Sequence, residues 1–246
     1  QNEGTPSLVV AAYRLSFSVI ILIPILFSRY NDKFRNIALK DIGKCFLGGL
    51  FLAIHFATWI SSLEYTSIAS SVVIVTTNPI WVALFTIIFQ RVRPDKLLII
   101  GLVIALAGGA VVGISEGCEF SQGALKCAGE TQLRNTSLGN ILALIGAWMA
   151  AGYLLVGKNI RQRMPLLPYI FLVYGFAAII LVVYQLVFGN GLAIPNSKAF
   201  IWLVSLAIFP QLLGHSSLNW VLKKLSATYV SIALLAEPIG STLMGI

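Results

Sequence analysis

The chain of 246 residues has few charged side chains, few cysteines and few histidines. Charged residues make up 11% of it, whereas a soluble domain carries about 25%. This scarcity excludes a cytosolic enzyme and a disordered chain. Three cysteines do not make a small secreted module built on disulfides. The two histidines form no H-E-x-x-H motif and no zinc-ligand spacing, so we expect no metal site and no cofactor.

Apolar residues, in contrast, make up 58% of the chain. They gather in eight stretches of about 20 residues, the length that crosses a hydrocarbon layer of about 30 Å. The stretches are residues 7–28, 44–63, 67–90, 97–115, 138–157, 167–188, 199–222 and 226–246. The sequence therefore predicts an all-α polytopic protein whose partner is the lipid bilayer.

Basic residues concentrate in alternate loops between these predicted spans. The basic loops are residues 29–43, 91–96, 158–163 and 223–224. The intervening loops hold only Lys126, Arg134 and Lys198. This alternation predicts cytoplasmic basic loops. The net charge of +8 thus indicates orientation, and we expect no nucleic-acid partner, because no basic face carries interleaved aromatics.

A shift of 159 residues superposes the spans 7–28, 44–63 and 67–90 on 167–188, 199–222 and 226–246, and pairs Pro79 with Pro238. The spans 138–157 and 97–115 would map just beyond the two ends of the chain. We therefore expect a repeat unit of five helices that occurs twice, ten helices in all. On this expectation, eight of the ten are present, and the two terminal helices are missing. An odd number of helices inverts the second repeat. The predicted parts are a first repeat (1–115), a non-cytoplasmic loop (116–137) and a second repeat (138–246).

That long loop contains Cys118 and Cys127. An oxidising exterior would permit a disulfide between them, although both thiols could equally remain free. Cys45 lies in a span and is interpreted as a small buried apolar residue.

Glu237 lies midway along the last span, directly before Pro238. An ionisable side chain there is costly unless it faces protein or a watery cavity. It could bind a substrate amine or take up a coupling proton, or its carboxyl group could bond to backbone groups freed by the proline. The paired position is Asn78, before Pro79, and interrupted helices at matching positions are typical of a transporter cavity.

Polar side chains also follow single helix faces. Gln211, His215 and Asn219 recur every four residues, and such a stripe is hard to place against lipid, so we expect it to line a cavity. His55 and Trp59 share a face of their span, where they could stack a ligand or make an interhelical hydrogen bond.

Three weaker candidates complete the expected substrate-binding set. Trp148 and Tyr153 lie in span 138–157, where aromatics also serve helix packing. Arg14 lies inside the first span and is best interpreted as snorkelling to the outer interface; alternatively, it anchors an anionic substrate group.

The residues from Gly113 to Gly117 match the G-x-S-x-G nucleophile elbow by letter only. That motif needs a strand before it and a helix after it, whereas here a predicted membrane helix comes before it and a polar loop after it. We therefore expect no enzyme, and an intramembrane enzyme remains a rival hypothesis without a motif.

The stretch 55–81, HFATWISSLEYTSIASSVVIVTTNPIW, resembles the EamA-type drug/metabolite transporter superfamily. Residues 6–14, 140–153 and 225–239 are similar to its other characteristic helices. The resemblance departs at Asn78, where many members carry glutamate, which argues against a symmetric two-carboxylate mechanism.

This resemblance implies two inverted five-helix repeats around a central cavity, in a bacterial inner membrane, with cytoplasmic termini. It also implies a transporter that exports small metabolites such as amino acids, amines or drug-like compounds by alternating access. The alternatives are an exchanger of nucleotide sugars or sugar phosphates, or a membrane protein that transports nothing. Multiply anionic substrates would need several intramembrane cations, and the sequence offers only Arg14.

Overall fold

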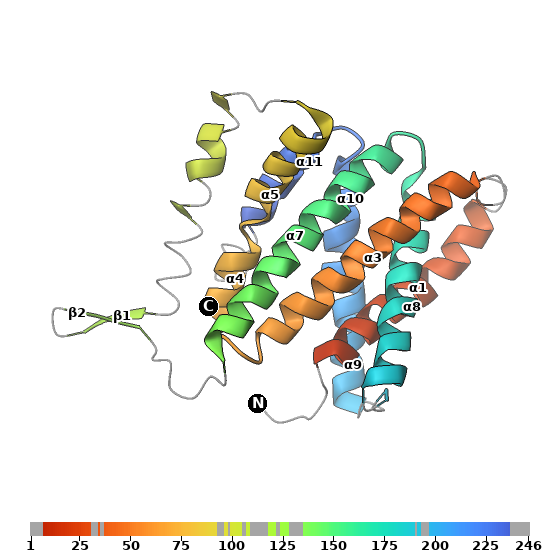
Figure 1. Cartoon of the computed structure of the whole chain (residues 1–246). Coiled ribbons are helices and arrows are strands. Elements are labelled where there is room, and N and C mark those ends of the chain that lie inside the picture. The colour runs from red at the N-terminus through yellow and green to blue at the C-terminus, as the bar shows by residue number, and fades with distance from the viewer. Residues whose placement is uncertain are drawn as a thin grey trace. The chain divides into compact units, whose positions relative to one another are not determined.

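The structure, a computed structural model, describes residues 7–30, 34, 37–92, 96–97, 99–104, 107–108, 118–121, 124–127, 135–189, 191–192 and 197–236. The described part of the chain is helical apart from one short hairpin and the connecting turns (Figure 1).

The helices follow the order that the apolar stretches predict. The first half contains α1 (Ser7–Arg29), α3 (Leu39–Ser62), α4 (Ile68–Val75), α5 (Asn78–Phe85) and the π-helix η1 (Thr86–Gln90). The second half contains α7 (Thr136–Arg161), α8 (Leu166–Phe188), α9 (Ser197–Leu206), the π-helix η2 (Ala207–His215), α10 (Ser216–Val221), α11 (Ala227–Ala233) and the 3-10 helix η3 (Leu234–Ala236).

Six helical segments in the described ranges are long and apolar enough to cross a membrane. The described residues of the predicted span 97–115 are also helical, as are residues 227–236 of the predicted span 226–246. The prediction of a multi-pass helical membrane protein is therefore confirmed.

Two predicted boundaries were wrong in detail. The helix α3 begins at Leu39 and α7 ends at Arg161, so parts of the predicted loops 29–43 and 158–163 are helical. Hydropathy marks only the stretch that fits the hydrocarbon layer, while the helix itself continues into water.

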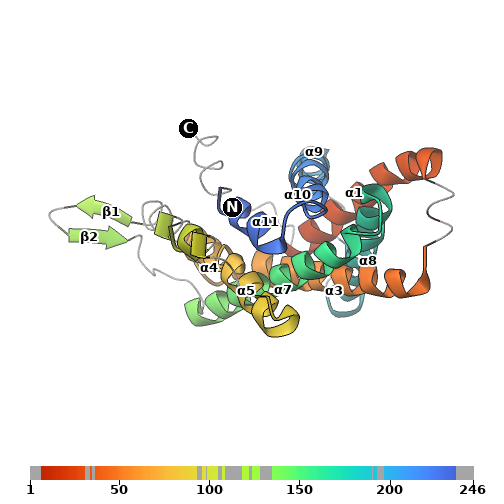
Figure 2. The ribbon, with the colours of Figure 1, turned by 90° about the horizontal axis from the view of Figure 1, so that it is seen from above.

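A short hairpin lies in the predicted loop 116–137. Strand β1 (Cys118–Ser121) pairs antiparallel with β2 (Ala124–Cys127), as Figure 2 shows from above. The register places Cys118 opposite Cys127, so the backbone brings the two positions of the predicted disulfide together.

The chain forms two compact units, and neither unit coincides with one repeat. Unit 1 comprises residues 1–57 and 152–225, and unit 2 comprises residues 58–151 and 226–246. The long helices α3 and α7 contribute to both units. Helices that the 159-residue shift relates to one another are therefore found in the same unit.

In unit 1, α1 packs along α8 and also contacts η2 and α9 (Figure 1). The helix α3 approaches α8 closely at Gly49, where an added Cβ would lie 2.7 Å from the Cβ of Phe176. Leu15, Phe56 and Tyr174 are among the fully buried side chains of this unit, and they make its core.

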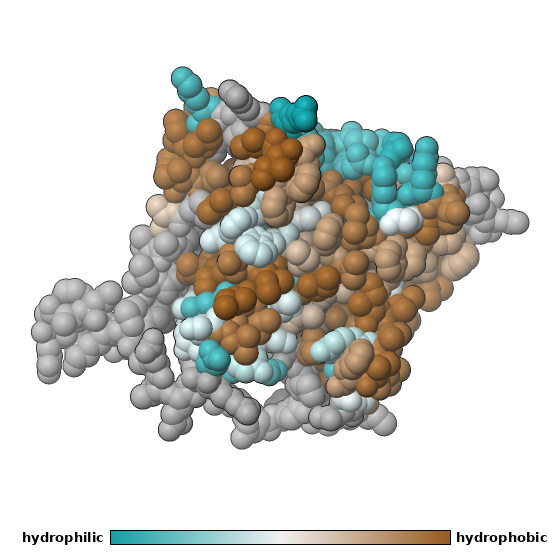
Figure 3. Space-filling view, in the orientation of Figure 1, coloured by the Kyte–Doolittle hydropathy of each residue, from teal (hydrophilic) through white to brown (hydrophobic). Residues whose placement is uncertain are grey.

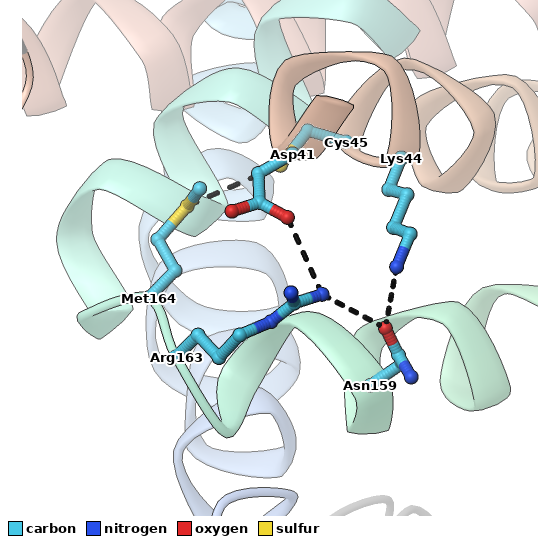
Figure 4. Close-up of polar contacts among 6 residues, drawn as sticks. All are labelled: Asp41, Lys44, Cys45, Asn159, Arg163 and Met164. Carbon is cyan, nitrogen blue, oxygen red and sulfur yellow. Dashed lines mark hydrogen bonds and ion pairs between the residues drawn. The ribbon is translucent and has the colours of Figure 1, made fainter. Parts of the chain in front are cut away.

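Polar contacts join the helix ends at one end of unit 1 (Figure 4). Arg163 forms an ion pair with Asp41 at 3.3 Å and donates to the side chain of Asn159. Lys44 donates to the same Asn159 oxygen at 3.0 Å. The start of α3 and the end of α7 therefore share one end of the unit. Hydrophilic residues gather there, while the helix surfaces are largely hydrophobic (Figure 3).

In unit 2, α5 packs against α11, and α4 and α11 begin with the same cap. The hydroxyls of Ser67 and Ser226 accept hydrogen bonds from the backbone N–H groups of Ser70 and Tyr229, three residues on. Both serines have φ −67° and extended ψ values of 152° and 157°. Positions 67 and 226 differ by the repeat offset, so the structure reproduces the repeat in its backbone geometry.

Removing either cap should weaken its helix by a similar amount. We expect Ser67→Ala and Ser226→Ala each to lower the free energy of unfolding by about 1 kcal/mol, measured as unfolding of the purified protein in detergent. Ser205, whose hydroxyl donates to Ile201 within α9, is the control, and Ser205→Ala should change stability less. Equal losses for all three variants would contradict the cap assignment.

The span 67–90 is interrupted where the sequence predicted. The turn at Thr76 and Thr77 separates α4 from α5, just before Asn78 and Pro79. Proline has no N–H to continue the helix. The hydroxyls of Thr76 and Thr77 donate to the carbonyls of Val73 and Ile74 at 3.0 and 2.6 Å, so local side chains satisfy backbone groups that lipid could not.

Candidate functional site

A cluster of polar and aromatic side chains fills the interior of unit 1. It begins with Arg14 on α1, whose side chain is only 8% exposed. The Nε of Arg14 donates a hydrogen bond to Oε1 of Gln211 at 2.9 Å. Gln211 is itself fully buried, so the pair connects two helices far apart in the chain within the apolar interior.

The segment that carries Gln211 is a π-helix and not the α-helix that the four-residue spacing predicts. The π-helix η2 contains Pro210 and ends at His215. Proline removes one backbone donor, and π-helical segments occur often at functional sites. Ser18 of α1 donates to the carbonyl of Ala207 at 3.1 Å, which ties the start of η2 to the helix that carries Arg14.

Asn219 is the hydrogen-bonding centre at the other side of the cluster. Its Nδ2 lies within hydrogen-bonding distance of the hydroxyls of Tyr153, at 2.5 Å, and Tyr174, at 3.4 Å, and of the backbone carbonyl of His215, at 2.8 Å. The hydroxyls of Tyr174 and Ser216 lie 3.3 Å apart. This network joins α7, α8 and α10.

His215 connects Asn219 with Arg14 through Phe56. The ring of Phe56 lies 4.6 Å from the guanidinium carbon of Arg14, and its centroid lies 5.5 Å from that of His215, edge to face. Tyr153 and His215 also have neighbouring rings, 6.4 Å apart. His55, the residue before Phe56, is buried and interacts electrostatically with His215.

Unit 2 holds a second group of predicted residues. Trp148 meets Trp81 edge to face, with ring centroids 5.2 Å apart, and Trp81 donates to the hydroxyl of Thr77. Asn78 is buried at the start of α5. The Oδ1 of Asn78 and the Nε1 of Trp148 have no hydrogen-bond partner among the described residues. Trp59 lies beside Gly146 of α7, where an added Cβ would come 3.2 Å from the Cβ of Trp59.

Two features favour a transporter. One is a buried polar cluster in membrane-crossing helices, and the other is a helix that is interrupted at a position paired between the two repeats. A family model, that of the EamA-like transporter family, matches residues 2–114 and 137–246. The chain belongs to the EamA-like transporter family.

Solved structures with this EamA-like fold are known, and 20 chains match. One is a crystal structure described only as that of a protein. Its sequence is 18% identical to this chain, and the two structures superpose with a TM-score of 0.75. The match covers 98% of this chain and 78% of the chain in that structure. An identity this low shows the fold alone. No significant match occurs among curated proteins.

Six predicted site residues of this EamA-like chain meet in unit 1: Arg14, His55, Tyr153, Gln211, His215 and Asn219. Trp59, Asn78 and Trp148 belong to unit 2. Glu237 lies outside the described residues. The structure corrects the interpretation of Arg14 as a snorkelling residue, because its guanidinium points inward to Gln211.

Sequence reasoning missed Phe56, Tyr174 and Arg161. Phe56 and Tyr174 look like ordinary apolar packing residues, although a buried tyrosine hydroxyl usually needs a partner. Arg161 counted as one of the cytoplasmic charges. Its side chain is 2% exposed, which its charge did not predict, and it donates to the backbone carbonyls of Asn219, at 2.9 Å, and of Met164.

Proposed function

We propose that the chain is a secondary transporter that exports small organic metabolites by alternating access. The observation that carries this proposal is the buried cluster around Arg14, Gln211, His215 and Asn219 in unit 1. Polar and ionisable side chains in the bilayer interior are costly, and they mark substrate pathways. Amino acids, amines and drug-like compounds are the substrate classes that we expect from the family resemblance.

Access to the cluster requires opening of the helix ends. At one end of unit 1, Asp41 and Arg163 join α3 to the end of α7, and Gln162 donates to the carbonyl of Lys223 after α10. Arg163 is 46% exposed, so breaking the ion pair costs little, whereas the buried Arg161 still joins the end of α7 to the backbone of α10. Rocking of helix groups about a fixed site is the usual route of alternating access.

Orientation is the next part of the proposal. We place the basic helix ends in the cytoplasm of a bacterial cell and the hairpin β1–β2 outside it. Residues directly opposite in an antiparallel pair have Cα atoms about 4.5–5.5 Å apart, within the range of a disulfide. We propose that Cys118 and Cys127, which face one another in the register, are oxidised there.

Labelling of intact cells tests this orientation. A membrane-impermeant maleimide should label the protein only after a mild reductant has opened the disulfide. Cys45 is buried and should stay unlabelled, and Cys118→Ser with Cys127→Ser should abolish the signal. Labelling that appears only after the cells are broken open would contradict the orientation, and labelling without reductant would contradict the disulfide.

Solute flux tests the function itself. A thermal-shift screen of amino acids, amines and sugars on the purified protein identifies ligands, and each labelled ligand is then assayed in proteoliposomes. We expect flux above that of protein-free vesicles for at least one ligand. Glu237→Gln should remove pH dependence if Glu237 carries a coupling proton. Absence of flux for every ligand would contradict the transporter proposal.

A further inference from the structure

Arg161 is a buried cation that forms no ion pair among the described residues. Its side chain, at the end of α7, is 2% exposed. Its Nε and Nη1 donate to the backbone carbonyls of Asn219, at 2.9 Å, and of Met164, and both acceptors are uncharged. A guanidinium has five N–H donors, and Nη2 of Arg161 donates to no described residue. The hydrogen bonds therefore hold the group in place but do not neutralise it.

A second unpartnered group, the hydroxyl of Tyr169 on α8, lies close to this guanidinium. Tyr169 is fully buried, and its hydroxyl has no hydrogen-bond partner among the described residues. It lies against Gly157 of α7, where an added Cβ would come within 2.7 Å of the hydroxyl oxygen. Gly157 precedes Arg161 by one turn, so the two positions share a face of the helix. The side chains of Arg161 and Tyr169 also interact electrostatically.

The charge balance of unit 1 leaves Arg161 without a counter-ion. Asp41 is the only acidic residue in the described part of this unit, and it pairs with Arg163 at 3.3 Å. Burying an ion without a partner is costly, and buried polar groups rarely lack one. A buried cation and an unpartnered hydroxyl near each other therefore indicate a bound anion.

The packing around Tyr169 limits the size of such an anion. The added Cβ at Gly157 would also lie 3.1 Å from Cδ1 of Leu222, so the hydroxyl lies among closely packed side chains. Arg161 and Tyr169 themselves expose almost no surface. A phosphate or an organic acid brings several further atoms into this packed region, whereas a halide brings one.

We propose that Arg161 and Tyr169 bind one small inorganic anion, of the size of chloride, where α7, α8 and α10 meet. The guanidinium Nη2 and the Tyr169 hydroxyl donate hydrogen bonds to the ion, and its charge neutralises that of Arg161. Hydrogen bonds to an ion are about twice as strong as those between neutral groups. The ion stabilises the junction of the three helices, and this role does not depend on whether the protein transports a solute.

Replacing chloride with a larger anion tests this site. The full chain in detergent is transferred to sodium gluconate, and chloride is titrated in at constant ionic strength while the melting temperature is followed. The same titration is made on Tyr169→Phe, which removes only the hydroxyl, and on Tyr184→Phe as the matched control. Tyr184 belongs to the same helix, but it is 48% exposed and lies outside the site.

Wild type and Tyr184→Phe should melt at higher temperature as chloride replaces gluconate, because a ligand that binds only the folded state stabilises it. Tyr169→Phe should raise the dissociation constant of chloride about 10-fold or more, because a hydrogen bond to an ion is lost. In gluconate it should melt close to wild type. Arg161→Gln should abolish the dependence on chloride, and bromide in a crystal should give an anomalous peak between Arg161 and Tyr169.

Three outcomes would overturn the inference. The first is that wild type melts at the same temperature in chloride and in gluconate. The second is that Tyr169→Phe leaves the chloride titration unchanged, because the stabilisation is then a general effect of salt; this variant decides the question if Arg161→Gln does not fold. The third is that Tyr169→Phe melts lower than wild type by the same amount in both anions, which assigns the hydroxyl to packing alone.

Discussion

Replacing Arg161 with alanine is expected to lower the free energy of unfolding by about 3 kcal/mol or more. Arg161 is almost fully buried and donates to the carbonyls of Asn219 and Met164. Hydrogen bonds from a charged donor contribute about 1.5–3 kcal/mol each. Their loss would leave two buried carbonyl oxygens without this donor and would detach the end of α7 from α10.

Arg163 provides a matched control two residues further on. Its side chain is 46% exposed and pairs with Asp41 at 3.3 Å, and exposed ion pairs contribute about 0–1 kcal/mol. Unfolding of Arg161→Ala, Arg161→Lys and Arg163→Ala in detergent should therefore give a large, an intermediate and a small loss. Similar losses for Arg161→Ala and Arg163→Ala would contradict a special role for Arg161.

Replacing Asn219 with alanine should cost about 2–4 kcal/mol. The side-chain amide of Asn219 lies against the hydroxyls of Tyr153 and Tyr174 and the carbonyl of His215 in a fully buried position. Removing it takes the donor from these acceptors and leaves a cavity. Tyr174 retains Ser216 as a partner, which limits the loss on that side.

Asn159→Ala is the control for this second prediction. Asn159 is exposed and accepts hydrogen bonds from Lys44 and Arg163, so its loss should cost less than about 1 kcal/mol. The comparison uses unfolding in detergent, and wild-type solute flux in Asn219→Ala would show that the network serves stability alone. Equal costs at Asn159 and Asn219 would contradict the assignment of Asn219 as the centre of the network.

Much of the fold could be predicted from the sequence because a membrane constrains it strongly. Each crossing helix needs an apolar stretch of fixed length, so the spans are visible in the composition alone. The interruption before Asn78 was predictable because Pro79 cannot continue the hydrogen-bond ladder. The repeat was visible from a few residue pairs, and the caps at Ser67 and Ser226 now give it a structural basis.

Only part of the candidate site could be predicted, because polar residues stand out in an apolar span and aromatic residues do not. Gln211, His215 and Asn219 stand out because polar side chains are rare in lipid. Their partners Phe56 and Tyr174 do not, because aromatic residues are equally common in simple packing. The π-helix η2 was also invisible, since a four-residue spacing fits either helix type over so short a stretch.

Which residues share a unit could not be predicted from the repeat. His55 and Trp59 occupy one helix at a spacing of four, yet they belong to different units. The burial of Arg161 could not be predicted from the pattern of charges either. Its position at the end of a span indicates a cytoplasmic arginine, and only the surrounding backbone carbonyls of α10 and of the α7–α8 turn explain its burial.

Counterflow in proteoliposomes is the measurement that tests the central claim most directly. Vesicles containing the purified protein are preloaded with an unlabelled ligand from the thermal-shift screen, diluted, and given a trace of the same labelled ligand outside. An alternating-access transporter with its substrate site in unit 1 predicts transient accumulation of label above equilibrium, and its loss in Gln211→Glu. A rise to equilibrium without overshoot, or an overshoot that Gln211→Glu leaves unchanged, would contradict this account.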